Sequence, residues 1–254
     1  MATSTHVFKS VDGLDISVDI HLPTAASASN PVNKVLVWWH GGGLLQGTRK
    51  GMSPHMQSAP DKHGIAVVAA DYRLAPQTRI PGIIADARDV VAWVQSEAFG
   101  EAVQSKATNE NVYTSGSSAG GWLSLLVASE LSFDKLGVKP LPRPVTGCIA
   151  IYPITDITDP FWTTKQRPVS YMEGRIIDGP SELGEYLDPK APPTASSSLD
   201  SPRAQFYHYM IQEAILQELL LTGTDIKAGD MAVGPAVKDG RIKKMPPTIV
   251  IHGT

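Results

Sequence analysis

The sequence predicts an α/β fold in which a mostly parallel sheet lies between layers of helices. Five short runs of apolar residues indicate strands that are buried on both faces: 34–39, 65–70, 112–115, 145–152 and 248–252. Two segments with apolar residues at helical spacing, 81–98 and 119–131, lie between these runs. Alternation of strands and helices implies right-handed crossovers and therefore parallel pairing of the strands.

The N-terminal segment predicts an antiparallel hairpin at one edge of this sheet. Residues 5–22 alternate loosely between apolar and polar, and Asp12-Gly13 occupies the turn position between two runs. A loop rich in Pro, Ala, Ser and Asn follows at 23–33. With 254 residues, of which 42% are hydrophobic and 19% charged, the chain has the size and composition of a globular α/β protein.

One interval between two predicted strands is much longer than a single crossover helix requires. About 95 residues separate the runs at 145–152 and 248–252, whereas a crossover helix needs about 10–15. Residues 153–200 are rich in Pro, Ser, Thr and Asp, and 201–221 predicts one long amphipathic helix that Ser201-Pro202 begins. We expect a core at 1–152, an inserted helical cap at 153–220 and a return to the core at 221–254. The alternative is that 153–220 is only a helical packing layer.

Gly116-Ser117-Ser118-Ala119-Gly120 fits the pattern G-x-S-x-G, with a predicted strand before it and a predicted helix after it. A serine on such a sharp turn keeps its hydroxyl clear at the carboxyl end of the sheet, where the helix N-terminus favours negative charge. Gly116 and Gly120 fit because the turn packs against a strand and leaves no room for a Cβ. The pattern therefore predicts Ser118 as a nucleophile.

His40-Gly41-Gly42-Gly43 follows directly on the predicted strand 34–39. A backbone without side chains at this place can turn its N–H groups to a point above the sheet. Together with the N–H of Ala119, Gly41–Gly43 would bind the negative oxygen of a tetrahedral intermediate. A merely flexible loop is the alternative, and the apolar flanks on both sides disfavour it.

Residues 71–76, Asp-Tyr-Arg-Leu-Ala-Pro, form a third segment after the strand at 65–70. With it, the chain resembles the hormone-sensitive-lipase-like branch of the α/β hydrolases over roughly residues 7–254. The resemblance implies a three-layer α/β-hydrolase fold with Ser118 as nucleophile and with Gly41, Gly42, Gly43 and Ala119 as the oxyanion hole. It also implies that Tyr72 and Arg73 brace the loops under the site. Asp86 we interpret as a helix-surface or bracing charge.

The departure from that family is at the C-terminus. In this fold the acid and then the histidine of the triad follow the nucleophile, and the family has both after the strand that matches 248–252. Neither partner is found in this chain, and the last strand and helix of the fold are also expected to be missing, so that the chain ends at the penultimate strand. Of the two histidines after Ser118, we expect His208 on the cap helix to be packing. His252 should lie two strands away, at ~10 Å, against the ~3 Å of a proton transfer.

The remaining candidate groups predict no cofactor and no metal. Cys148 lies in an apolar run and, as a single cysteine, serves as a small core residue. Four histidines without metal-ligand spacing are read as surface or turn residues: His6, His21, His55 and His63. Three aspartates are read as solvated loop charges: Asp225, Asp230 and Asp239.

Charge and hydropathy exclude other classes of partner. The net charge of −3 without a basic patch gives no reason to expect nucleic acid, and no apolar stretch is long enough to span a membrane. The first residues lack the pattern of a secretory signal, so a cytoplasmic protein is expected.

These observations predict a hydrolase of carboxylic esters that works through an acyl-enzyme on Ser118 and is crippled if the acid and histidine are lost. The aromatic residues of the cap suggest a small ester with an apolar acyl or aryl group. A non-catalytic ligand-binding protein of the same fold, such as a pseudoenzyme or a receptor, is the alternative, and amidase, lactonase or acyltransferase chemistry would use the same groups. Self-association through the open apolar edge at 248–252 is also expected.

Overall fold

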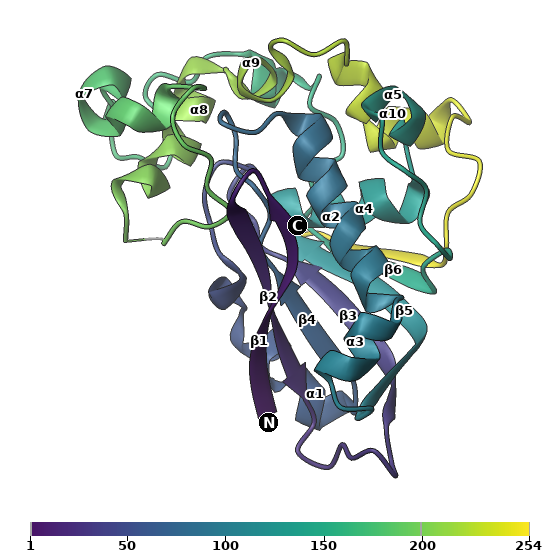
Figure 1. Cartoon of the computed structure of the whole chain (residues 1–254). Helices are drawn as coiled ribbons and strands as arrows, with labels where there is room; N and C mark the ends of the chain where they lie inside the picture. Colours follow the sequence, from purple (N-terminus) through teal and green to yellow (C-terminus); the bar gives the residue numbers. More distant parts are fainter. Residues whose placement is uncertain (1, 199, 254) are drawn as a thin grey trace.

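The computed structural model describes residues 2–198 and 200–253, and it contains a seven-stranded sheet in the order β1-β2-β4-β3-β5-β6-β7 (Figure 1). The strands are β1 (Ala2–Val11), β2 (Leu14–Leu22), β3 (Val32–Trp39), β4 (Ala66–Ala70), β5 (Ala107–Ser117), β6 (Gly147–Ile151) and β7 (Thr248–Ile251). From β4 to β7 all neighbours are parallel, while β1 and β2 join antiparallel. The predicted α/β fold with a mostly parallel sheet is confirmed.

The predicted N-terminal hairpin is also confirmed. β1 and β2 pair antiparallel at the edge of the sheet, and the turn residues Asp12 and Gly13 have φ values of 51° and 80°. A tight hairpin turn with positive φ at both central positions matches the twist of the strands, and Asp-Gly is a sequence that tolerates it.

Helices cover both faces of the sheet, which gives three layers. Their bounds are α1 (Pro54–His63), α2 (Ile80–Val94), α3 (Glu97–Ala102), α4 (Ala119–Ser129), α5 (Phe133–Leu136), α6 (Pro160–Thr163), α7 (Gly179–Leu183), α8 (Phe206–Glu213), α9 (Leu216–Leu221) and α10 (Val233–Lys238). Short 3₁₀ turns accompany them: η1 (Arg49–Gly51), η2 (Gly184–Leu187), η3 (Pro202–Gln205) and η4 (Ala228–Met231). Met56 of α1 packs with Leu36 and Trp38 on one face, whereas α2 and α4 pack on the other face beside Val35 and Val37.

The prediction of a single helix over 201–221 is wrong. The segment is divided into η3, α8 and α9, and the break between the last two is at Ala214, which has a left-handed φ of 57°. The N–H of Ile215 donates to the Met210 carbonyl across this break, as in a helix that ends in a Schellman motif. The change of direction buries Met210 on one side of the break and Leu216 on the other, a tertiary reason that the local pattern does not contain.

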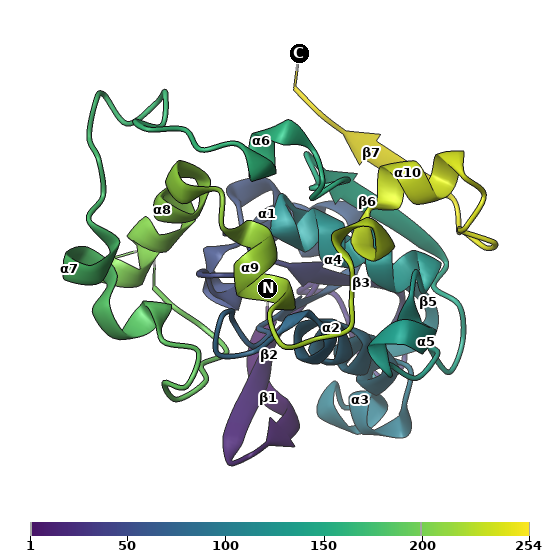
Figure 2. The same cartoon turned by 90° about the horizontal axis from the view of Figure 1, so that it is seen from above.

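Helices α7, α8 and α9 lie at the level above the carboxyl ends of the parallel strands in Figure 1, and α7 and α8 extend to one side of the sheet in Figure 2. Hydrogen bonds of the segment 153–220 reach the loops of the core: the Leu74 N–H donates to the Thr194 carbonyl at 2.9 Å. The role of this segment as a cap remains a prediction. After it, η4 and α10 lead back to β7.

β7 is the outer strand of the described sheet and pairs only with β6. Its side chains Ile249, Val250 and Ile251 are exposed by 60%, 54% and 49%. Consecutive residues of a strand point to opposite faces, so both faces of this edge present apolar surface to solvent. Unpaired backbone groups beside apolar side chains form a template for another strand.

A protein of residues 1–254 is therefore expected to self-associate through β7. Its sedimentation coefficient should rise with concentration, and Ile249→Lys should suppress the rise because a lysine on an edge strand opposes strand pairing. Val7→Lys, at a half-exposed valine of β1 on the opposite edge, is the control and should not suppress it. A monomeric boundary at all concentrations would contradict the expectation.

Candidate active site

Ser118 lies between the end of β5 and the start of α4, with φ 54° and ψ −119°. An L-residue rarely adopts this conformation, which costs about 1–3 kcal/mol and persists only where the surroundings hold it. The Ser118 N–H donates to the Ile151 carbonyl at 2.9 Å, and its own carbonyl accepts from the Trp122 N–H at 3.0 Å. β6 and α4 thus fix the strained residue, whose side chain stays half-exposed.

The glycines on either side of Ser118 are required by close backbone contact. A Cβ on Gly116 would lie 2.8 Å from the carbonyl oxygen of Trp39, and one on Gly120 would lie 2.6 Å from that of His40. Both carbonyls belong to the end of β3 or the residue after it. The first turn of α4 therefore packs directly on the backbone of β3, as the sequence predicts.

The glycine loop after β3 passes beside the serine. A Cβ on Gly41 would lie 3.2 Å from the Ser118 Cβ, and Gly42 and Gly43 have positive φ values of 103° and 67°. Ala119, the first residue of α4, is buried next to Ser118. The structure thus brings all five predicted site residues to one place, and the conformations of Gly42 and Gly43 explain why glycine occupies these positions.

A buried pair of rings supports this loop from below. His40 stacks on Tyr72 with ring centroids 4.3 Å apart, and its Nδ1 donates to the Gly41 carbonyl at 2.7 Å. The Tyr72 hydroxyl donates to the His40 carbonyl at 3.0 Å. Burial lowers the pKa of His40 to about 4, so the ring is neutral at pH 7. Tyr72 braces the loop as the resemblance implies, and His40 has a supporting role that the sequence did not indicate.

Asp86 is fully buried, and its interpretation as a helix-surface charge is wrong; its bracing role is observed. Arg73 donates to it through Nε at 2.7 Å and through Nη2 at 2.9 Å, and the Lys9 ammonium lies 2.7 Å from it. A two-pronged guanidinium contact of this kind holds a carboxylate in one geometry. The contact between Arg73 and Asp86 therefore attaches the loop that contains Tyr72 to helix α2.

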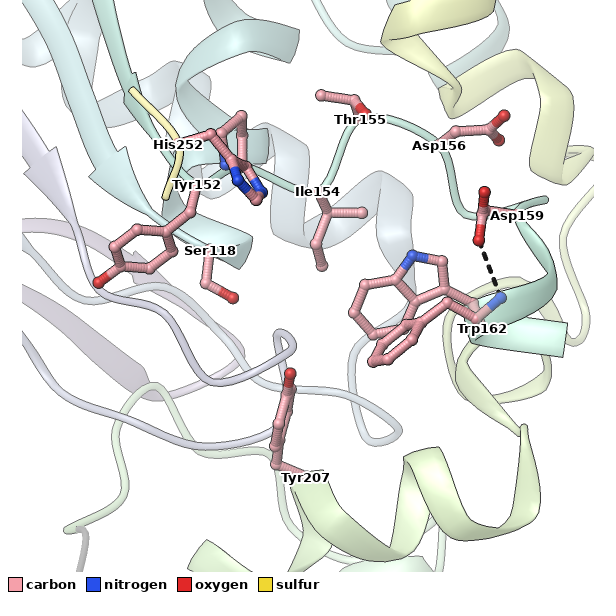
Figure 3. A pocket seen from close by; sticks show the side chains of 11 residues that line it. Ser118, Tyr152, Ile154, Thr155, Asp156, Asp159, Trp162, Tyr207 and His252 are labelled. Carbon is pink, nitrogen blue, oxygen red and sulfur yellow. Dashed lines mark hydrogen bonds between the residues drawn. The ribbon is translucent and has the colours of Figure 1, made fainter. Parts of the chain in front are cut away.

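Ser118 opens into a cavity of about 330 Å³ (Figure 3). The lining residues are Ser118, Tyr152, Pro153, Ile154, Thr155, Asp156, Asp159, Phe161, Trp162, Tyr207 and His252. Figure 3 shows the hydroxyl of Tyr207 pointing toward Ser118 from the opposite wall. The ring of Tyr207 also packs on the glycine loop, because a Cβ on Gly43 would lie 2.9 Å from its Cδ2. Sequence reasoning missed Tyr152 and Tyr207, which come from segments far from the motif.

The two histidines that follow Ser118 differ in their positions. His252 lies after β7, two strands from β5, and lines the Ser118 cavity, but among the described residues it has no hydrogen bond to Ser118. His208 packs edge-on against Tyr207 and lies 3.2 Å from the Tyr171 hydroxyl, away from the cavity lining. Burial is the main cause that lowers the pKa of His208. His208 thus packs as expected, and within residues 2–198 and 200–253 no carboxylate is hydrogen-bonded to either ring.

Other expected roles are partly corrected. His21 is not a surface residue: it is buried on β2 beside Thr3, and burial lowers its pKa. Asp230 is not a free loop charge, because it pairs with Lys135 at 2.6 Å. Cys148 is a buried free thiol, as predicted, and its Sγ donates to Ser124 Oγ at 3.6 Å. Within residues 2–198 and 200–253 no three His, Cys, Asp or Glu side chains are grouped to hold a metal ion, and no helix is long and apolar enough to cross a membrane.

Comparison with known proteins identifies relatives of two kinds. The family model described as alpha/beta hydrolase fold matches residues 36–208. The non-reducing polyketide synthase ausA of Aspergillus calidoustus is 26% identical over 245 residues, which are 89% of this chain and 10% of the synthase. The non-reducing polyketide synthase stbA of Stachybotrys bisbyi is 42% identical over 94 residues, 37% of this chain and 4% of the synthase. The chain thus spans at most a small share of these curated relatives.

Solved structures agree with the architecture. An alpha/beta hydrolase superfamily protein from Enterococcus faecalis superposes with a TM-score of 0.66 at 24% identity, covering 97% of this chain and 77% of that one. Carboxyl esterase 2 from the fungus Tuber melanosporum superposes with a TM-score of 0.61 at 20% identity, covering 98% and 66%. At these identities the similarity concerns the fold.

The buried bracing of the site gives a stability prediction. Asp86→Ala leaves Arg73 and Lys9 without their buried partner and should lower the free energy of unfolding by about 3–5 kcal/mol. Asp89→Ala is the matched control on the same helix: it removes a partly exposed pair with the same Lys9 and should cost about 1 kcal/mol or less. Urea denaturation measures both values, and equal losses would contradict the bracing role.

Proposed function

The chain belongs to the alpha/beta hydrolase fold family, and on that premise we propose that it is a hydrolase of carboxylic esters that forms an acyl-enzyme on Ser118. The single observation that carries the proposal is the strained backbone of Ser118, with φ 54° and ψ −119°, in the lining of a cavity. A conformation that costs free energy and exposes a hydroxyl is typical of a functional position.

In the proposed reaction the Ser118 Oγ bonds to the acyl carbon and its proton leaves. The carbonyl oxygen becomes negative, and backbone N–H groups of Gly41–Gly43 and Ala119 stabilise it, each by about 3–4 kcal/mol in the transition state. The bond to the alcohol then breaks, the alcohol takes a proton, and water later cleaves the acyl-enzyme. Efficient turnover needs a proton acceptor about 3 Å from the Ser118 hydroxyl, and we assign that role to no described residue.

The cavity supports an apolar acyl or aryl group as the part of the substrate next to Ser118. Four aromatic side chains line it: Tyr152, Phe161, Trp162 and Tyr207. Phe161 and Trp162 form an edge-to-face pair with ring centroids 4.6 Å apart, and both residues line the cavity. The similarity to fungal non-reducing polyketide synthases favours a polyketide acyl group as the acid part of the substrate.

A non-catalytic binding role is the second candidate. It is favoured by one observation: among the residues that the structure describes, no histidine or carboxylate is hydrogen-bonded to the Ser118 side chain. A protein of this kind would use the cavity for a ligand and leave the serine inactive.

Labelling with a fluorophosphonate probe separates the two functions. Ser118 should react in the wild-type protein, and Ser118→Ala should abolish the label, because only an activated serine attacks the probe at a useful rate. Ser117→Ala changes the neighbouring serine of the same turn and should retain labelling. A wild-type protein that reacts no faster than Ser118→Ala would favour the binding role.

The acyl preference is tested with Trp162→Ala. The burst of p-nitrophenol from p-nitrophenyl benzoate should fall about tenfold or more relative to that from the acetate, since a lost aromatic contact in a pocket is worth about 1–3 kcal/mol. Tyr171→Ala, at an exposed aromatic residue outside the cavity lining, is the control. An unchanged benzoate-to-acetate ratio in Trp162→Ala would remove Trp162 from the acyl site.

A further inference from the structure

Arg203 carries a buried positive charge whose contacts are all neutral. The residue is 4% exposed and lies in η3. Its Nε donates to the Leu45 carbonyl at 2.6 Å, and its Nη2 donates to the Ala75 carbonyl at 2.8 Å and to Gln77 Oε1 at 2.9 Å. The ring of Tyr186 lies 5.4 Å from its Cζ. No carboxylate of the described chain forms an ion pair with it.

Two other arginines beside the core, Arg49 and Arg73, are neutralised by carboxylates, whereas the half-buried Arg79 donates to backbone carbonyls of α9. Arg49 pairs with Asp71 and, at 2.9 Å, with Asp19, and Arg73 pairs with Asp86. A buried charge without a counter-charge is costly, and folded proteins usually pair it. Burial lowers the pKa of Arg203 to about 10, which still leaves the group charged at pH 7. Arg203 is therefore a cation that has no carboxylate partner among the residues described.

A second cavity of about 370 Å³ adjoins this guanidinium. Its lining is Gln77, Glu185, Tyr186, Ala191, Pro192, Thr194, Ser196, Ser197, Ser198, Ser201 and Arg203, none of which lines the Ser118 cavity. The carboxylate of Glu185 is exposed and makes no ion pair with Arg203 in the described structure. This cavity is therefore separate from the Ser118 cavity, and residues with hydroxyl side chains line it together with Arg203.

Several hydrogen-bond donors of this cavity have no partner among the described residues, and two of them belong to the exposed residues Ser196 and Ser198. Nη1 of Arg203 donates to no described residue, in contrast to Nε and Nη2. The hydroxyl of Ser198 accepts from the Asp200 N–H but donates to no partner, and Ser196 has no side-chain hydrogen bond within the described ranges. Ser201 and Thr194, in contrast, donate to carbonyls of the same loop. Unused donors around an unpaired cation fit an acceptor that carries negative charge.

From these contacts we infer that the cavity beside Arg203 binds a carboxylate or phosphate group of a small molecule. The planar guanidinium fork suits both anions, which accept parallel N–H bonds, and the serine hydroxyls can rotate to donate to the remaining oxygens. Binding at this site requires no reaction at Ser118. The inference therefore goes beyond the proposed hydrolase function and is tested independently of it.

Equilibrium dialysis of the 254-residue chain against radiolabelled inorganic phosphate and, separately, acetate tests the site at constant ionic strength. At least one of the two anions should bind to a single saturable site, and the stronger one identifies the chemistry of the ligand. Arg203→Gln should weaken binding about tenfold or more, because charge-assisted bonds are lost. Arg143→Gln, at an exposed arginine outside this cavity, should leave the affinity unchanged.

Gln77→Glu keeps Arg203 and gives a second, independent measurement. It puts a carboxylate where Oε1 now lies 2.9 Å from Nη2, so the missing counter-charge is supplied by the protein and anion binding should fall about tenfold or more. Gln77 Nε2 also donates to the Tyr186 and Asp188 carbonyls, so Gln77→Ala, which loses the same bonds without adding a charge, is the control and should retain binding. If Arg203→Gln does not fold, Gln77→Glu decides. Non-saturable uptake of both anions by the wild-type protein, or affinity that survives Gln77→Glu, would overturn the site.

Discussion

The site depends on one close contact, in which the first turn of α4 rests on the backbone at the end of β3. Gly116 and Gly120 allow this contact, because a Cβ on either would meet the carbonyl oxygens of Trp39 or His40. It fixes the direction in which β5 turns into α4 and so forces Ser118 into its strained conformation. The chain leaves β3 at the same point, which brings the glycine loop beside the serine. Serine and loop are therefore positioned by a single packing constraint.

The sheet and this elbow could be predicted because their signals are local. Runs of apolar residues such as 34–39 and 65–70 mark strands buried on both faces, and the glycines at 41–43, 116 and 120 occupy positions where a side chain would clash or where φ is positive. A short motif carries such constraints completely, since the atoms that make them are near in sequence or belong to the adjacent strand.

The features that the sequence patterns did not predict depend on contacts with residues far away in the sequence. The spacing of apolar residues over 201–221 fits one continuous helix. Only the burial of Met210 and Leu216 in the core explains the break at Ala214. The burial of Asp86 is decided by Lys9 and Arg73, and that of Arg203 by carbonyls at Leu45 and Ala75. No pattern around these residues encodes such contacts. Among the described residues that line the Ser118 cavity, His252, Asp156 and Asp159 are likewise hydrogen-bonded elsewhere and not to Ser118.

The packing of Tyr207 on Gly43 links the rigidity of the glycine loop to the size of the Ser118 cavity. One face of the phenol ring supports the backbone that would hold the oxyanion, while its hydroxyl end forms a wall of the cavity. A shift of α8 that enlarges the cavity for a bulkier acyl group also withdraws the support of the glycine loop. Divergence in ligand size would therefore change the rigidity of the loop at the same time, and a relative with a wider cavity needs another residue to replace this contact.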